Sequence, residues 1–245
     1  MEPLLIIDAG HGGKDPGGGS CEYFTEAAMN LQISLYQFHR CQELGIPTVL
    51  TRKDDTYLGY KTRSNLVKDS GARYCISNHI NNASNPNASG AETIHSIYSD
   101  GKMANAILNE IVKQGMDKRR VFTRASNHDP TKDYYYMHRL TGSVETVIVE
   151  YGFASNDSDK KRIHAFWKVY AEAALRGFMF FAGLGLKYEP PEKPHIVPDY
   201  KQEGVDFLFD NNLLTDENWK KDIDASLPMW AIGLILKRMA TEKED

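Results

Sequence analysis

Cysteine is scarce in this chain, and its spacing gives it no structural pattern. Cys21, Cys41 and Cys75 are spread over 245 residues, and no two of them form a Cys-x-x-Cys pair. An odd number of distant cysteines argues against both a disulfide framework and a cysteine zinc site. We therefore expect a protein made in a reducing cytoplasm.

The chain also lacks a strong net charge and a long apolar run. Its 29 basic and 33 acidic residues leave a net charge of −4, which favours no nucleic-acid partner. The apolar run near residues 178–186 is too short to span a bilayer, so no membrane insertion is expected. The N-terminus shows neither the basic segment nor the apolar stretch of a signal peptide. Synthesis in the cytoplasm without a signal peptide is the resulting expectation.

What the chain does contain is a regular alternation of strand and helix patterns. Hydrophobic residues make up 41% of the sequence, which is enough for a substantial core. The alternation predicts an α/β fold with a single twisted, mostly parallel sheet flanked by helices. Residues 119–137 form a long, charged stretch that we expect to be irregular. Strands are expected at residues 4–7, 46–50, 73–77, 91–98 and 145–151, and helices at 25–45, 59–70, 102–116 and 157–182.

A change in composition near residue 187 predicts a domain boundary. Pro190, Pro191 and Pro194 stand close together, and prolines favour extended chain over helix. We predict a main domain over residues 1–186, a linker over 187–198 and a small helical module over 199–245. A unit this small rarely holds itself together by core burial alone, so pairing with a second copy or docking on the main domain is expected.

Two histidines and a carboxylate follow buried strands at places that should converge. His11 stands in a Gly-His-Gly-Gly loop after residues 4–7, His79 follows residues 73–77, and Glu150 ends the last strand. The carboxyl ends of parallel strands meet at one edge of a sheet. Two imidazoles and a carboxylate there have the chemistry of a zinc centre with an open position. Which carboxylate binds a metal and which acts as a base stays open, because the chain offers further candidates: Glu22, Glu26, Glu92 and Glu145.

Five sequence blocks along the chain together resemble those of a known protein family. Residues 8–17 read Asp-Ala-Gly-His-Gly-Gly-Lys-Asp-Pro-Gly, and the later blocks are Glu26-Ala-Ala-Met-Asn-Leu31, Thr51-Arg52 with Arg63-Ser64-Asn65, Ser77-Asn-His-Ile-Asn81 and Glu150-Tyr-Gly-Phe-Ala-Ser-Asn156. In this order they resemble the zinc-dependent N-acetylmuramoyl-L-alanine amidases of the amidase-3 family, which include bacterial autolysins and phage endolysins. The resemblance covers residues 4 to about 185.

The resemblance implies a site and a reaction. One zinc ion per catalytic domain would be held by His11, Glu26 and His79, and Glu150 would be the catalytic carboxylate. The bond cut would be the amide between N-acetylmuramic acid and L-alanine of the peptidoglycan stem peptide, so bacterial peptidoglycan is the expected partner. The implied substrate-binding residues are Arg63, Asn81, His138 and Arg139.

Two other functions stay open beside the amidase. A zinc carboxypeptidase acting on peptidoglycan stems could share the architecture, and a degenerate, non-catalytic wall-binding protein could share the fold. The block at residues 8–17 favours the amidase over the former. The presence of all four chemical positions argues against the latter. An amidase without a signal peptide is typical of an endolysin or a mother-cell lysin that acts at the cell wall after release.

The resemblance is weaker at two places. Asn78 stands where the family has an apolar residue, so its role is open between a hydrogen bond to the site and a polar pocket of its own. Residues 204–238 resemble small helical modules that follow amidase domains. Cell-wall binding and homodimerisation are both expected roles for this module.

Overall fold

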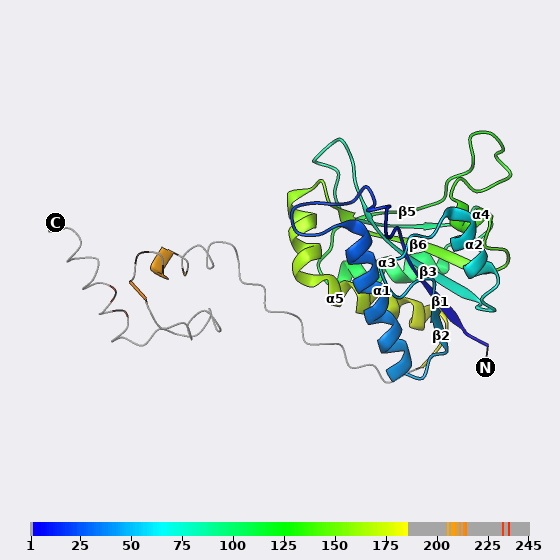
Figure 1. The fold of residues 1–245 in the computed structure, drawn as a ribbon, viewed down its shortest axis with the longest axis horizontal. Coiled ribbons are helices and arrows are strands. Elements are labelled where there is room, and N and C mark those ends of the chain that lie inside the picture. The colour runs from blue at the N-terminus through cyan, green and yellow to red at the C-terminus, as the bar shows by residue number, and fades with distance from the viewer. Residues whose placement is uncertain are drawn as a thin grey trace. The chain divides into compact units, whose positions relative to one another are not determined.

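The computed structural model of this chain describes residues 2–185 and isolated residues between 205 and 235. Six strands form one sheet in the order β2-β1-β3-β6-β4-β5 (Figure 1). The strands are β1 (Leu5–Ala9), β2 (Thr48–Leu50), β3 (Tyr74–Asn81), β4 (Ala91–His95), β5 (Lys118–Phe122) and β6 (Glu145–Phe153). The helices in this part of the chain are α1 (Glu26–Glu43), α2 (Tyr60–Lys68), α3 (Lys102–Lys113), α4 (Tyr136–Arg139) and α5 (Asp157–Phe181).

The sheet is mostly parallel, which confirms the predicted fold class. Strand β1 pairs in parallel with β2 and β3, and β3 pairs in parallel with β6. Strand β4 runs antiparallel to β6 and parallel to the edge strand β5. The carboxyl ends of β1, β3 and β6 therefore meet at one edge of the sheet, and the amino end of β4 joins them there.

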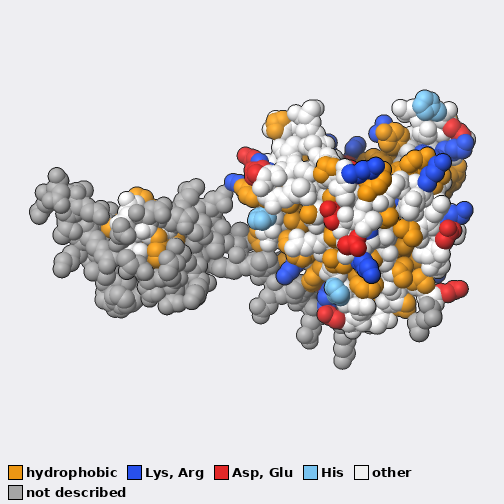
Figure 2. Space-filling model, in the orientation of Figure 1, with side chains coloured by type: hydrophobic (Ala, Val, Ile, Leu, Met, Phe, Trp, Pro, Cys, Tyr) orange, Lys and Arg blue, Asp and Glu red, His pale blue; other side chains and the backbone are white. Residues whose placement is uncertain are grey.

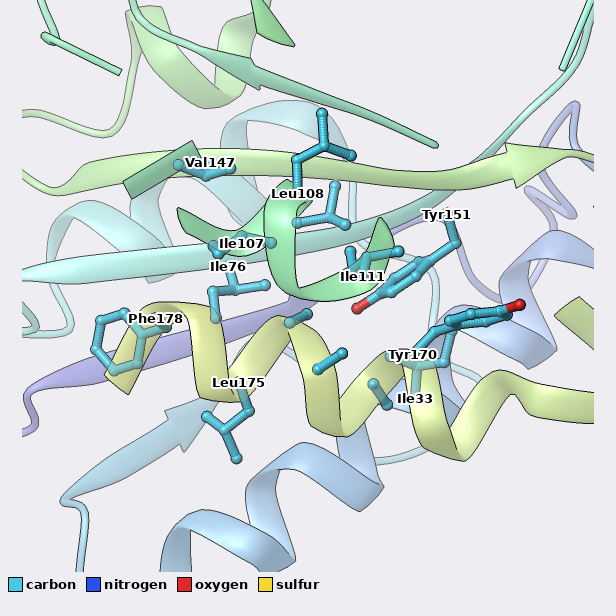
Figure 3. Packing of buried hydrophobic residues seen from close by; sticks show 14 of the residues in the cluster. Ile33, Ile76, Ile107, Leu108, Ile111, Val147, Tyr151, Tyr170, Leu175 and Phe178 are labelled. Carbon is cyan, nitrogen blue, oxygen red and sulfur yellow. The ribbon is translucent and has the colours of Figure 1, made fainter. Parts of the chain in front are cut away.

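One face of the sheet is covered by α1, α3 and α5. Side chains alternate between the two faces of a strand, so Leu5 and Ile7 of β1 point to this side. There they join the large buried cluster that Figure 3 shows from close by. Helix α5 lies very close to α3, because a Cβ atom on Gly177 would stand 2.5 Å from the Cα of Ile107. Burial of this apolar surface is the main force that holds the sheet and the helices together.

The opposite face is covered over only part of its length. Helices α2 and α4 cover a smaller apolar cluster that includes Ile6, Cys75 and Ile148. Two residues further along each of these strands, the same face carries the polar side chains of Asp8, Ser77 and Glu150 instead. Two loops rise beyond this edge of the sheet, near residues 82–90 and 123–135, and the surface dips between them (Figures 1 and 2).

The stretch over residues 119–137 is more ordered than predicted. It contains most of β5 and the beginning of the single-turn helix α4. The first three residues of β5, Lys118, Arg119 and Arg120, are exposed at the edge of the sheet, so they show none of the apolar alternation that predicts a strand.

The C-terminal predictions lie largely outside the described residues. Internal contacts divide the chain into one unit over residues 1–193 and another over 194–245. In the second unit, residues 205 and 207–209 are helical, and Leu213, Leu214 and Ile235 are buried together. None of the helices among the described residues combines the length and the apolar character that a membrane span requires.

A chain that ends at residue 186 is expected to fold by itself. Among the described residues, those of the large core cluster and the side chains packed against it lie between positions 4 and 184. We expect a soluble product whose thermal unfolding midpoint lies within about 4 °C of the full chain, equivalent to roughly 1 kcal/mol for a domain of this size. Calorimetry of both proteins measures this, and aggregation of the shorter chain would place the boundary elsewhere.

Candidate metal centre

The loop after β1 has an unusual backbone conformation that favours glycine. His11, Gly12 and Gly13 all have positive φ angles, of 61°, 132° and 58°. Residues other than glycine rarely adopt this conformation, so the histidine is held there by its surroundings. A Cβ atom on Gly10 would lie 2.3 Å from the His79 ring, so glycine is required where the loop passes β3. The loop thereby brings His11 beside His79.

Three predicted ligands converge at this place. The Nε2 atom of His11 lies 3.2 Å from Oε1 of Glu26, and Nδ1 of His79 lies 3.1 Å from the same oxygen. One donor atom from each of the three side chains lies within 4.8 Å of the others. The two imidazole rings meet edge to face, with centroids 5.0 Å apart. Two imidazoles and one carboxylate fit zinc, and three protein ligands leave a coordination position open for chemistry.

Hydrogen bonds fix the orientation of these groups. Oδ2 of Asp15 lies 2.9 Å from Nδ1 of His11, so the other ring nitrogen, Nε2, faces Glu26. The backbone amide of Gly19 donates to Oε2 of Glu26 at 2.7 Å, and that of Ile80 donates to Oε1 at 3.2 Å. A carboxylate on the second nitrogen of a histidine is a common support for metal ligands. Asp15 was not singled out from the sequence, although its spacing of four from His11 within the glycine loop was a usable signal.

The three ligand side chains shift one another's pKa values strongly. Burial would lower the pKa of His11, but the hydrogen bonds and charges of Glu26 and Asp15 outweigh it and raise that pKa to about 9. Burial would likewise raise the pKa of Glu26, yet His11 and His79 together hold it well below its usual range. The Glu26 carboxylate is therefore ionised and can bind a cation. A metal ion that binds here would replace the proton on the His11 imidazole.

Glu150 lies on β6 beside these ligands. It pairs with His79 across β3 and β6. Its buried Oε2 atom has no hydrogen-bond partner among the described residues. Burial raises its pKa to about 7, and the negative charges of Glu26 and Glu92 add to this effect. An unpaired carboxylate with a pKa near neutrality is suited to general acid–base catalysis.

Arg63, predicted to bind substrate, is buried and paired with another side chain in the structure. This side chain is only 2% exposed, and its Nη1 atom lies 2.7 Å from Oδ1 of the fully buried Asp8. Its Nη2 atom donates to the backbone carbonyl of His11 at 2.7 Å. Arg63 is therefore a positioning residue that holds the loop carrying His11, with no face left for a ligand.

His138, also predicted to bind substrate, is buried as well. Its ring is buried in α4 and lines a cavity of about 570 Å³ together with Glu145 and Thr146, at the other end of β6 from Glu150. Burial lowers the pKa of His138 to about 4. The ring is therefore neutral at pH 7 and lies away from the metal ligands.

The other two predicted substrate-binding residues lie closer to the surface. Arg139 is exposed, and its Nη1 atom donates to the backbone carbonyls of Asp133 and Tyr134 at 2.6 and 2.8 Å. The Asn81 amide is half-buried at the end of β3 and donates to Oε1 of Glu92 at 3.2 Å. Asn81 therefore stands next to the candidate site, whereas Arg139 supports the loop before α4.

Asn78 belongs to a polar network on the other face of the sheet. Its amide nitrogen donates to Oγ of Ser34 at 2.9 Å and to Oε1 of Gln37 at 2.8 Å. Its carbonyl oxygen accepts a hydrogen bond of 2.9 Å from the Tyr151 hydroxyl. All of these groups are buried under α1, so the Asn78 side chain anchors that helix to the sheet.

Comparison with known proteins agrees with this geometry. The amidase-3 family model, described as N-acetylmuramoyl-L-alanine amidase, matches residues 5–177. The chain is 28% identical to the Bacillus subtilis protein YqiI over 159 residues, which are 65% of this chain and 74% of that one. It is 25% identical to the N-acetylmuramoyl-L-alanine amidase LytC of Bacillus subtilis over 172 residues, 70% of this chain and 34% of LytC. The match thus spans about a third of the length of LytC.

Among solved structures, the fold is similar to the N-acetylmuramoyl-L-alanine amidase AmiC2 of Nostoc punctiforme. The TM-score is 0.64 at 25% sequence identity, and the match covers 75% of this chain and 98% of that one. Because the family model spans more than two thirds of the sequence, the chain belongs to the amidase-3 family of N-acetylmuramoyl-L-alanine amidases.

Proposed function

We propose that this protein is a zinc-dependent amidase that acts on peptidoglycan in the bacterial cell wall. The bond cut is the amide between N-acetylmuramic acid and L-alanine of the stem peptide. The observation that carries the proposal is the convergence of His11, Glu26 and His79 beside the unpaired carboxylate of Glu150. Family membership supplies the class of reaction.

The residues of the site divide the work of amide hydrolysis. His11, Glu26 and His79 would hold the zinc ion, which when bound lowers the pKa of a water molecule and polarises a carbonyl group. Glu150 accepts a proton from the attacking water as the water oxygen adds to the amide carbon. Glu150 then returns that proton to the departing nitrogen of L-alanine as the carbon–nitrogen bond breaks. Burial raises the pKa of Glu150 above its usual range, which favours its holding and returning the proton.

Removal of the metal tests this proposal. We expect a chelator to abolish release of stem peptides from purified cell wall, and added zinc to restore it. His79→Ala should lose both bound zinc and activity, because two ligands remain where three are needed. His128→Ala is the matched control, since His128 is an exposed loop histidine. Full activity in a preparation shown by elemental analysis to hold no metal would refute the zinc mechanism.

The products separate the amidase from its alternatives. An amidase releases intact stem peptides with a new amino group on L-alanine, and mass spectrometry of digested wall detects them. A carboxypeptidase instead removes residues from the far end of the stem, and a non-catalytic wall-binding protein releases nothing.

A further inference from the structure

A row of four side chains crosses the sheet from the metal ligands to its edge. Strand pairing places His79 of β3 beside Glu150 of β6, Glu150 beside Glu92 of β4, and Glu92 beside Arg120 of β5. Neighbouring strands lie about 4.8 Å apart, so the backbone of Arg120 stands roughly 14 Å from that of His79. We call these four residues the cross-strand row. It begins at the metal centre and ends at exposed basic residues on β5, where Figure 2 shows Lys and Arg side chains in blue.

The middle of the row contains two carboxylates that face each other. Glu92 is only 1% exposed and stands directly across from Glu150 in an antiparallel pair. Like charges in such a pair repel, so Glu92 requires positive partners. A bulge opposite Glu92 provides two of them, because the register shifts there and both Arg119 and Arg120 reach it. Nε of Arg119 lies 2.9 Å from Oε1, and Nε of Arg120 lies 2.6 Å from Oε2.

Arg119 and Arg120 differ in how much of the guanidinium group is left free to bind a ligand. Arg119 is held on three sides: by Glu92, by the Phe153 ring 5.0 Å away, and by the Ser89 carbonyl at 3.5 Å. Among the residues that the structure describes, the guanidinium of Arg120 forms a hydrogen-bonded ion pair only through Nε, and its side chain is 54% exposed. Within the described residues, its two Nη atoms have no hydrogen-bond partner.

Phe122 holds the free guanidinium group of Arg120 in place. It lies two residues further along β5, on the same face, and its ring centroid is 3.9 Å from Cζ of Arg120. Stacking on one side and the ion pair at Nε restrict the group before any ligand arrives. A planar group with two free donors matches a carboxylate in the two-pronged manner typical of arginine.

We propose that Arg120 binds the free α-carboxylate of the second residue of the stem peptide. This inference rests on the proposed amidase function, because it places the scissile amide at the metal centre. The γ-linked glutamate at that position carries its carboxylate off the main chain. An extended peptide advances about 3.5 Å per residue, so two residues bring that carboxylate to roughly 7–10 Å from the scissile bond. A long arginine side chain that points back along the row from β5 covers the remaining distance.

The test compares two substrates that differ only at this carboxylate. Both are N-acetylmuramoyl tripeptides with an amidated C-terminus. The second residue is D-glutamate in one and D-isoglutamine, whose α-carboxyl is an amide, in the other. We expect the native protein to cleave the free acid with a kcat/KM about tenfold to a hundredfold higher, the usual strength of a charge-assisted hydrogen-bonded pair. Arg120→Gln should remove this preference by lowering kcat/KM on the free acid alone, mainly through KM.

Two further variants separate a direct contact from a general effect of charge or fold. Arg120→Lys keeps the positive charge but lacks the two parallel donors of the guanidinium group, so it should retain part of the preference for the free acid. Arg124→Gln removes another exposed arginine, which stacks 3.7 Å from the Tyr134 ring, and it should change both substrates by the same small factor. Equal cleavage of the two substrates by the native protein, or an equal loss on both in Arg120→Gln, would overturn the inference. Failure to cleave either substrate or whole cell wall would instead refute the amidase function itself.

Discussion

Replacing Glu150 with glutamine is expected to reduce kcat by at least ~100-fold while zinc stays bound. The substitution keeps the size of the side chain and removes the group that accepts a proton, and a positioned acid–base group contributes about 10²–10⁴ in rate. The metal should remain, because Glu150 lies outside the ligand set of His11, Glu26 and His79. Zinc content by elemental analysis and release of stem peptides from purified wall measure the two effects.

The matched variant is Glu26→Gln, which changes the other carboxylate of the site in the same way. This variant should have both a lower zinc affinity and a lower kcat, because Oε1 of Glu26 lies within 3.2 Å of a nitrogen atom of each imidazole. Loss of zinc in Glu150→Gln with zinc retained in Glu26→Gln would show that the two carboxylates have exchanged roles. Full activity in Glu150→Gln would show that the proton goes to another group.

Buried strands made the fold and the edge that holds the site predictable from the sequence. Apolar runs followed by glycine marked β1 and its loop, so His11 could be placed at the end of a strand. The same reasoning placed His79 and Glu150 at neighbouring strand ends. Sequence spacing left several carboxylates equivalent, and only the family resemblance selected Glu26. Its position depends on the Thr25 cap, which starts α1 so that Glu26 falls in the first turn.

The sequence is least informative about the burial of polar side chains and the register of strand pairing. Arg63 and His138 are polar residues within recognisable motifs, and composition does not show that both are enclosed by the fold. The edge strand β5 escaped prediction because its exposed basic residues resemble a charged loop. The bulge opposite Glu92 aligns Arg120 with Glu150, and such an alignment becomes visible only when the pairing of three strands is known.

Replacing Arg63 with methionine is expected to destabilise the protein by about 3–5 kcal/mol, since it leaves the charge of Asp8 buried without a partner. Asp8 is fully buried, and within the described residues its carboxylate is reached, besides Arg63, only by the hydroxyls of Thr51 and Ser77, each at 2.7 Å. Urea unfolding at pH 7 measures the change in the free energy of unfolding. Arg73→Met, at an exposed arginine, should stay within about 0.5 kcal/mol of the native protein.

The pH dependence of this loss identifies its cause. Burial would raise the pKa of Asp8, but the Arg63 guanidinium and the two hydroxyls outweigh it and lower that pKa in the native protein. The pair therefore stabilises the fold above the unfolded pKa of about 4, and this contribution is lost as the pH falls through the native pKa. Without Arg63 the pKa of Asp8 rises above its unfolded value, so the variant is weakest at neutral pH. The gap between the two proteins should narrow steadily from pH 7 towards pH 4, and Asp8→Asn combined with Arg63→Met should recover part of the loss at pH 7. A gap that stays constant with pH would mean that lost packing and the bond to the His11 carbonyl, rather than the charge of Asp8, account for the effect.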